Sequence, residues 1–313
     1  MTVAGDDSTK AALNDARTLM LGSQILFGFQ LQAPFQNAFE ALSETERAVE
    51  LVLVPLMVGV IGLLIAPSAR HRLVEQGGKS RELENFITGV SAAVIPLFAL
   101  ALAFDLFIAG TRIAGFVAGV LCGLVGFAAT LAVCGALSGR WSMPRRVAVD
   151  KQDTPLDMRV QYVLTEARVI LPGAQALLGF QLAILLTQGF MQLDGGERIV
   201  HGIAIACVAL ATAFLMAPAA QHRLIYGGEN RPDFYRSANR HLLVASVFLA
   251  AGIAADAHVV AMKIAESRAV ALAVSVVSAA MLFGLWHVWP LLARRHLGSA
   301  GRASAPRLEN IAD

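Results

Sequence analysis

The chain has 313 residues, of which 56% are hydrophobic and 15% charged, and its mean hydropathy is +0.62. Soluble domains carry about 25% charged residues, so this composition excludes an ordinary soluble domain and is typical of a membrane protein. A net charge of +2 is too small to favour a nucleic-acid partner. The three cysteines lie inside apolar runs and form no Cys-x-x-Cys pair, which indicates packing residues rather than metal ligands.

Eight apolar runs are long enough for helices that cross a bilayer, which need about 20 residues each. They cover residues 18–39, 51–67, 86–104, 113–139, 169–193, 199–219, 242–262 and 269–293. We therefore predict an all-α polytopic membrane protein with eight transmembrane helices. In the fourth run, Gly115, Gly119 and Gly123 form a Gly-x-x-x-Gly pattern that predicts close packing against a neighbouring helix.

The chain contains two copies of one sequence, in which residue n of the first copy corresponds to residue n + 151 of the second. The pattern Arg-x-x-x-x-Gly-x-Gln-x-Leu-x-Gly-Phe-Gln-Leu, for example, begins at Arg17 and again at Arg168. We expect two domains, residues 1–150 and 151–313, each a four-helix membrane repeat. Because each copy has an even number of helices, both enter the membrane from the same side, so the repeats are predicted to be parallel.

The basic residues are distributed unequally between the two sides of the predicted membrane. All but five of the 25 lysine and arginine residues fall on one side; the other side has Arg47, Arg112, Arg198, Lys263 and Arg268. Since cytoplasmic loops carry the excess of basic residues, we expect both termini in the cytoplasm. Trp141, Trp286 and Trp289 fall on the same side, where aromatic rings favour the membrane interface.

Glutamines recur within the first helix of each predicted repeat, as Gln24, Gln30, Gln175 and Gln181. A carboxamide in hydrocarbon needs a hydrogen-bonding partner, so these side chains should face other helices or a wet cavity. One interpretation is a polar, substrate-binding path between the two repeats. The other, which is the commoner role of such residues, is interhelical hydrogen bonding worth about 0.6 to 2 kcal/mol per contact.

Two charged signatures are repeated at the predicted cytoplasmic boundary. An acid-x-Arg pair starts the first helix of each copy and a His-Arg pair ends the second, which gives Asp15, Arg17, His71, Arg72, Glu166, Arg168, His222 and Arg223. We expect this cytoplasmic clasp to form the ion pairs Asp15–Arg72 and Glu166–Arg223, each within one copy. It is either an ion-paired membrane boundary or, with histidine as a titratable neighbour, a pH-sensitive gate or a site for an anionic lipid or solute.

Two acids, Asp105 and Asp256, are embedded in apolar runs at corresponding positions. An intramembrane carboxylate is a candidate for proton relay. About 20 residues of helix, or about 30 Å, precede Asp105, which places it near the outer interface. Each acid has a basic residue seven positions on, so interfacial ion pairs, Asp105–Arg112 and Asp256–Lys263, are an interpretation at least as well supported as proton relay.

No familiar catalytic or cofactor-binding motif occurs in the chain. His201, His258 and His287 are scattered and have no repeated counterpart, so we expect no metal site, no cofactor and no enzymatic activity. Two classes of membrane protein remain. One is a transporter or channel for a small solute or cation, and the other is a non-transporting structural or regulatory protein. The lipid bilayer is the partner in both, with homo-oligomers as a further expectation for the second.

With the repeated core that begins at Arg17 and the later Ala-Pro-x-x-x-His-Arg, the chain resembles an uncharacterised bacterial family of four-helix integral membrane proteins, defined only as a domain of unknown function. The resemblance covers about residues 13–110 and 164–261 and implies a tandem fusion in a bacterial inner membrane. The family pattern falls on Arg17, Gln24, Gly28, Phe29, Pro67, His71 and Arg72, and on Arg168, Gln175, Gly179, Phe180, Pro218, His222 and Arg223. Some family members carry an automatic sodium:proton antiporter label. Such exchangers are expected to place an acid near the membrane midplane, and none of the eight runs has one.

Overall fold

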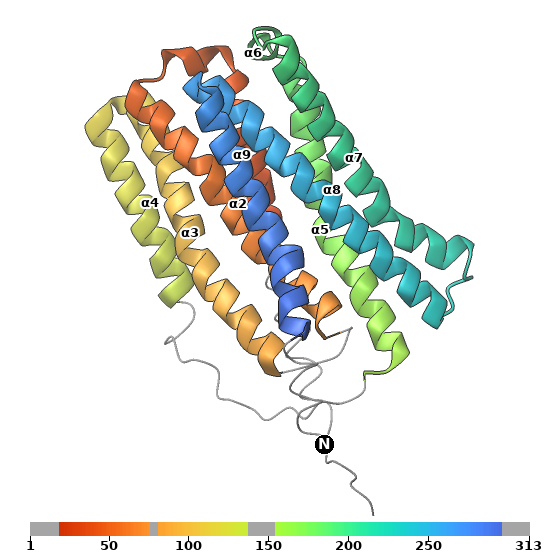
Figure 1. Cartoon of the computed structure of the whole chain (residues 1–313). Helices are drawn as coiled ribbons and strands as arrows, with labels where there is room; N and C mark the ends of the chain where they lie inside the picture. The colour runs from red at the N-terminus through yellow and green to blue at the C-terminus, as the bar shows by residue number, and fades with distance from the viewer. Residues whose placement is uncertain (1–18, 76–80, 137–153, 296–313) are drawn as a thin grey trace, which may run out of the picture.

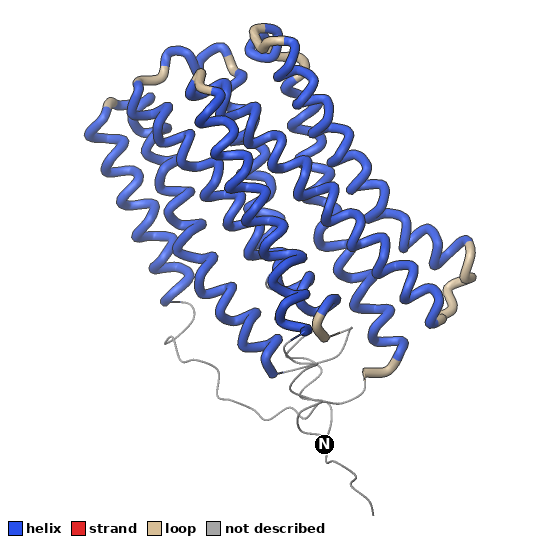
Figure 2. Tube along the Cα trace, in the orientation of Figure 1, coloured by secondary structure: helices blue, strands red, loops and turns tan. Residues whose placement is uncertain are grey.

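The computed structural model of the protein describes residues 19–75, 81–136 and 154–295, and these residues form helices and turns without a strand (Figures 1 and 2). The long helices are α2 (Glu44–Leu73), α3 (Arg81–Ala114), α4 (Phe116–Ala136), α5 (Leu156–Ile184), α7 (Gly195–Leu224), α8 (Pro232–Ala265) and α9 (Arg268–Phe283). The short ones are η1 (Ala33–Phe35), η2 (Asn37–Ala41) and α6 (Gln188–Met191). Residues 19–32 are also helical, and the π-helical turn η3 (Gly284–Val288) leads α9 on to residue 295.

Seven of these helices are long and apolar enough to cross a membrane: α2, α3, α4, α5, α7, α8 and the helix that runs from α9 to residue 295. The helix at residues 19–32 is the counterpart of α5 in the first repeat, and with it each repeat has four helices. The chain is therefore an all-α integral membrane protein of two four-helix repeats, as predicted.

The helix boundaries follow the repeat. α2 and α7 begin and end at corresponding residues, and so do α3 and α8. At the start of α2 the Ser43 hydroxyl accepts a hydrogen bond from a backbone N–H of the first turn, and at the start of α7 the Asp194 carboxylate accepts the corresponding one. Two different residue types therefore cap the same position of the repeat. Gly115 and its counterpart Glu266 both adopt a positive φ, which ends the third helix of each repeat.

α2 and α8 lie at the centre of the bundle (Figure 1). α2 packs against α3, α8, α9 and η3, and α8 also packs against α5, α7 and α9. The repeats therefore meet where α2 contacts α8 and α9, and where the helix at residues 19–32 contacts α5. In that second contact Gly28 lies against the Phe180 ring and Gly173 against the Gln24 carboxamide, and neither position has space for a Cβ atom.

The two ends of the bundle differ in composition. α2 and α7 end, and α3 and α8 begin, at what we call the arginine-rich end, whereas η1, η2 and α6 lie at the opposite, short-helix end (Figure 1). Corresponding helices of the two repeats run in the same direction, so the repeats are parallel, as predicted.

α4 packs against α3 at the edge of the bundle, and two glycines make this contact close. A Cβ atom at Gly119 would lie 2.6 Å from the Phe107 carbonyl oxygen, and one at Gly123 would lie 2.9 Å from the Ala103 carbonyl oxygen. The close packing predicted from the Gly-x-x-x-Gly pattern is confirmed.

One of the predicted interfacial tryptophans, Trp286, is instead fully buried. Its indole N–H donates to the Gly62 carbonyl oxygen of α2 at 2.9 Å, which joins η3 of the second repeat to the first. The interfacial prediction is wrong for this residue because α9 crosses onto α2 rather than lying at the edge. Trp289 is partly exposed, and Trp141 lies outside the described residues.

Candidate functional site

A polar cluster in the first repeat joins the helix at residues 19–32 to α2 and α3. The Gln30 amide Nε2 donates to both carboxylate oxygens of Asp105, at 3.3 and 3.1 Å. Glu50 is buried on α2 and interacts electrostatically with Asp105. We call Gln30, Glu50 and Asp105 the first acid cluster.

The second repeat has a cluster at the three corresponding positions, with the buried residues Gln181, His201 and Asp256. Gln181 Nε2 donates to Asp256 Oδ2, and Asp256 Oδ1 lies 3.6 Å from His201 Nδ1. His201 Nε2 lies 3.1 Å from the Gln181 carbonyl oxygen, which can only accept, so Nε2 carries a hydrogen. A hydrogen bond between Nδ1 and Asp256 then needs one further proton, on the imidazole or on the carboxyl group. We call these residues the second acid cluster.

Both acid clusters lie inside membrane-spanning helices, nearer the short-helix end. Glu50 stands in the second turn of α2, and Asp105 stands nine residues before the end of α3, or about 14 Å along the helix. An ionised side chain at the centre of a bilayer costs about 3 kcal/mol or more. This cost is smaller at the depth of the clusters, nearer one end of the bundle, and the glutamine amides that donate to Asp105 and Asp256 partly offset it.

The predicted ion pairs of Asp105 with Arg112 and of Asp256 with Lys263 are wrong. Arg112 donates to the Ala41 carbonyl oxygen at 3.1 Å, and Lys263 donates to Gln192 Oε1 at 2.7 Å. Seven residues separate each base from its acid by about 11 Å along the helix, so the basic side chain reaches the short helices at the end of the bundle. Asp105 and Asp256 instead accept hydrogen bonds from Gln30 and Gln181.

Two of the predicted glutamines, Gln24 and Gln175, are not brought together. Gln24 is buried beside Gly173, next to a cavity of about 10 Å³ that is otherwise lined by apolar side chains such as Leu177 and Ile253. A cavity of this size has room for about one water molecule. Gln175 is exposed on the surface of α5. The predicted polar path lined by both residues does not exist between the repeats in this conformation, whereas Gln30 and Gln181 each bind an acid.

The cytoplasmic clasp joins the two repeats rather than closing each of them. Arg72 Nη1 lies 3.0 Å from Glu166 Oε1, and both side chains are buried. Arg223, the predicted partner of Glu166, is exposed, so that predicted pair is wrong. The physical reason is that side chains at the end of α2 in the first repeat reach α5 of the second, where Arg72 meets Glu166 and His71 meets Tyr162, so the acid of one copy lies against the base of the other. Asp15, the predicted partner of Arg72, lies outside the described residues.

The other residues of the clasp are less closely engaged. His71 packs edge-on against the Tyr162 ring of α5, with ring centroids 5.3 Å apart. His222 lies 3.3 Å from the Asn230 amide oxygen and packs on Phe234. Arg168 is exposed, and Arg17 lies outside the described residues.

A polar cavity of about 90 Å³ opens between the repeats at the short-helix end. It is lined by Phe35, Gln36, Asn37 and Glu40 of the first repeat and by Gln188, Gly189, Gln192 and Lys263 of the second. The Phe35 ring that forms part of its wall lies 6.5 Å from the His201 ring, and the Phe190 ring lies 5.7 Å from it. The Phe35 ring therefore connects the wall of this cavity with the second acid cluster, and the Phe190 ring also packs beside His201.

Sequence reasoning missed Glu50 and His201, which are the two corresponding residues that differ in type between the clusters. A search for identical repeated residues passes over such a pair. The signal that could have found them is a titratable residue in both copies at one position of an apolar helix. Among the described residues no group of three or more His, Cys, Asp and Glu side chains is arranged to hold a metal ion.

Comparison with known proteins gives one family. A family model described as a family of unknown function matches residues 6–138 and again residues 150–290, which agrees with two tandem copies. Neither the curated proteins nor the solved structures give a match.

Proposed function

For a chain that belongs to the family of unknown function DUF6328 as two tandem copies, we propose transport of protons or small cations across the membrane by way of the two acid clusters. The observation that carries this proposal is the repetition of one buried polar arrangement: a glutamine bound to an aspartate, with a second titratable side chain beside it. Packing alone needs no titratable group at these positions, because an amide pair satisfies hydrogen bonds without a charge.

The chemistry of the two clusters suits a proton or a monovalent cation. Glu50 and Asp105 place two carboxyl groups within electrostatic reach of each other, and like charges in a low-dielectric site favour the uptake of one proton or cation by the pair. In the second acid cluster the imidazole of His201 lies 3.6 Å from the Asp256 carboxyl group, close enough for one proton or cation to be held between them. Gln30 and Gln181 donate to the aspartates, so each acid keeps a partner while the proton or cation leaves.

An access route at one end supports the same proposal. The polar cavity at the short-helix end reaches Phe35, whose ring lies against His201. Towards the arginine-rich end, the cavity beside Gln24 measures only about 10 Å³ and is otherwise lined by apolar side chains. The route is therefore open from the short-helix end as far as Phe35 and is narrow around Gln24. The excess of basic residues favours the arginine-rich end in the cytoplasm, so this route opens away from it.

A non-transporting structural or regulatory protein is the second candidate, and two observations favour it. The contact between the repeats is closely packed around Gln24, where the cavity measures only about 10 Å³, and Gln175 presents a carboxamide on the exposed surface of α5, where a second copy of the chain would give it a partner. Neither candidate is an enzyme.

Flux measurements on the purified protein in liposomes separate the two candidates. With a pH gradient and a panel of monovalent cations, we expect proton or cation flux that Asp105→Asn and Asp256→Asn each reduce at least about tenfold, because an amide in place of the acid removes the charge that the proton or cation neutralises. Asp233→Asn, at an exposed acid on the arginine-rich end of α8, is the matched control and should keep the flux. Absence of flux in folded protein would support the second candidate, whereas full flux in both variants would show transport that does not pass through the acid clusters.

A further inference from the structure

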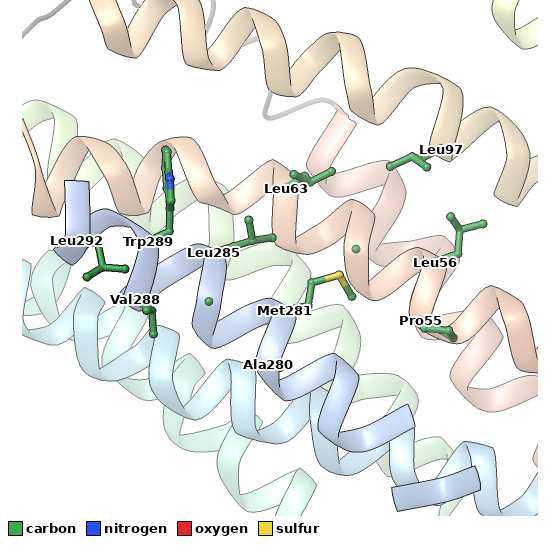
Figure 3. Close-up of a pocket in the computed structure, with 12 residues that line it drawn as sticks. Pro55, Leu56, Leu63, Leu97, Ala280, Met281, Leu285, Val288, Trp289 and Leu292 are labelled. Atoms are coloured by element: carbon green, nitrogen blue, oxygen red, sulfur yellow. The ribbon is translucent and has the colours of Figure 1, made fainter. Parts of the chain in front are cut away.

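An open apolar groove runs along the outside of the bundle between α2, α3 and α9 (Figure 3). Its volume is about 720 Å³, within the range of pockets that hold small ligands. Its walls are formed by apolar side chains and by the two glycines Gly59 and Gly284, which keep it wide. Such a groove lies among the acyl chains of the lipid when the protein is in a membrane.

The groove runs towards the arginine-rich end and finishes beside basic side chains. Trp289 lines it there, and the guanidinium carbon of Arg70 lies 5.5 Å from the centre of the Trp289 ring. Leu292 lines the groove one turn further along the helix. Arg295 follows Leu292 by three residues, on the same helix face, and is exposed, as is Arg294.

The charge of Arg70 is partly balanced. Its Nη2 lies 3.3 Å from a Glu82 carboxylate oxygen and 3.9 Å from one of Glu75. Arg70 therefore contributes less positive charge at the end of the groove than the exposed Arg294 and Arg295.

We propose that this groove binds an acyl chain of an anionic phospholipid, with the lipid phosphate at Arg294 and Arg295. Apolar walls along the depth of the membrane match the chain, and the arginines at the membrane surface match the charge of the headgroup. A second copy of the protein fits less well, because a symmetric contact along this groove would bring the same arginines of both copies together. The site does not involve the acid clusters, so it stands independently of transport.

Tryptophan quenching by brominated lipids tests this site in the intact protein, since Trp289 lies in the groove. The protein is reconstituted in vesicles that mix unlabelled phosphatidylcholine with dibromo-phosphatidylglycerol or with dibromo-phosphatidylcholine. Trp289→Phe identifies the part of the signal that comes from this residue. We expect phosphatidylglycerol to quench Trp289 with at least about fivefold higher apparent affinity, since a single arginine at the membrane surface contributes about that factor for an anionic lipid.

Two kinds of variant then separate the charge from the groove. Arg295→Gln should reduce the preference for phosphatidylglycerol about fivefold, through the loss of one surface charge. Gly284→Phe should abolish the preference, because nothing lies within 4 Å of a Cβ atom there and the ring would fill the groove. Gly202→Phe is the matched control, at an exposed glycine of α7 with the same open surroundings, and should leave the preference unchanged.

Three results would overturn the proposal. The first is equal quenching by the two lipids in the unmodified protein. The second is an unchanged preference in Gly284→Phe when circular dichroism and size-exclusion chromatography show normal folding. The third is a Trp289 signal that neither lipid quenches while the protein is dimeric, which would assign the groove to a second copy.

Discussion

The two repeats share their first three helices and differ in where the fourth one packs. In the first repeat α4 lies against α3 at the edge of the bundle, and its glycines allow backbone contact. In the second repeat α9 packs between α8 and α2, and valines stand at two of the corresponding positions. A helix without glycines cannot approach α8 as closely, so α9 is available to α2 of the other repeat. The difference shows how a duplicated unit acquires an interface. In the first repeat the fourth helix packs against the third helix of its own repeat, whereas in the second repeat it packs against the other repeat as well.

The same comparison explains the apolar groove. Its walls need α9 beside α2 and α3, and α4 does not approach α7 in the described structure. The acid clusters behave in the opposite way, because both repeats keep the glutamine and the aspartate and vary only the third residue. Interior polar positions thus follow the repeat, whereas the packing of the fourth helix departs from it.

The largest effect is expected at the ion pair between the repeats. Arg72→Ala leaves Glu166 as a buried charge without its partner, which should cost about 3 to 5 kcal/mol of stability. The corresponding exposed residue of the second repeat provides the control, and Arg223→Ala should change stability by no more than about 0.5 kcal/mol. Thermal unfolding in detergent measures both.

A double-mutant cycle sharpens this test. If Arg72 and Glu166 pair across the repeats, Arg72→Ala combined with Glu166→Ala should cost less than the sum of the single changes. Simple additivity would show that the two residues do not interact and would remove the clasp from the interface.

The ion pair of Arg72 and Glu166 also shows which features the sequence could predict and which it could not. Apolar runs and the constant offset predicted the helices, the two parallel repeats and the close packing of α4. They could not predict that Glu166 binds Arg72 rather than Arg223, because a partner within a copy and one across copies have the same pattern in a duplicated sequence. Glu50 and His201 were missed because their types differ, and Trp286 was misplaced because the path of α9 depends on packing with another repeat.

The second prediction tests why α4 stays at the edge. Gly119→Val places in α4 the residue that α9 has at the corresponding position, Val270. Its Cβ atom would meet the backbone of α3, so we expect a loss of about 3 kcal/mol, at the upper end of overpacking effects. Gly202→Val, where nothing lies within 4 Å, is the control. Unfolding in detergent gives the two values, and equal values would mean that α4 does not depend on close contact.

The third prediction concerns the hydrogen bond that secures α9 to the first repeat. Trp286→Phe removes the indole donor to the Gly62 carbonyl oxygen and leaves a small cavity, which together should cost about 2 kcal/mol. Trp289→Phe, on the same helix but partly exposed, should cost less than half as much. Similar losses at the two positions would indicate that the contact of η3 with α2 contributes little beyond apolar burial.

The smallest expected effect is the difference in stability cost between replacing the glutamine of the first acid cluster and replacing that of the second. Gln30→Leu leaves Asp105 without its hydrogen-bond donor and with Glu50 as its charged neighbour, which should cost about 2 kcal/mol. Gln181→Leu removes the same contact from Asp256, but His201 still faces that carboxyl group, so we expect a cost of about 1 kcal/mol although the site is more deeply buried. Burial alone predicts the reverse order, because the more buried donor would then matter more. Thermal unfolding of the two single variants shows whether the stability cost follows the number of partners that each aspartate keeps or the burial of the site. A second variant, His201→Leu combined with Gln181→Leu, should raise the cost in the second acid cluster to at least that of Gln30→Leu, because Asp256 then loses both contacts. If it does not, the two clusters are unlike in energy as well as in composition, and the repeat does not preserve a common site.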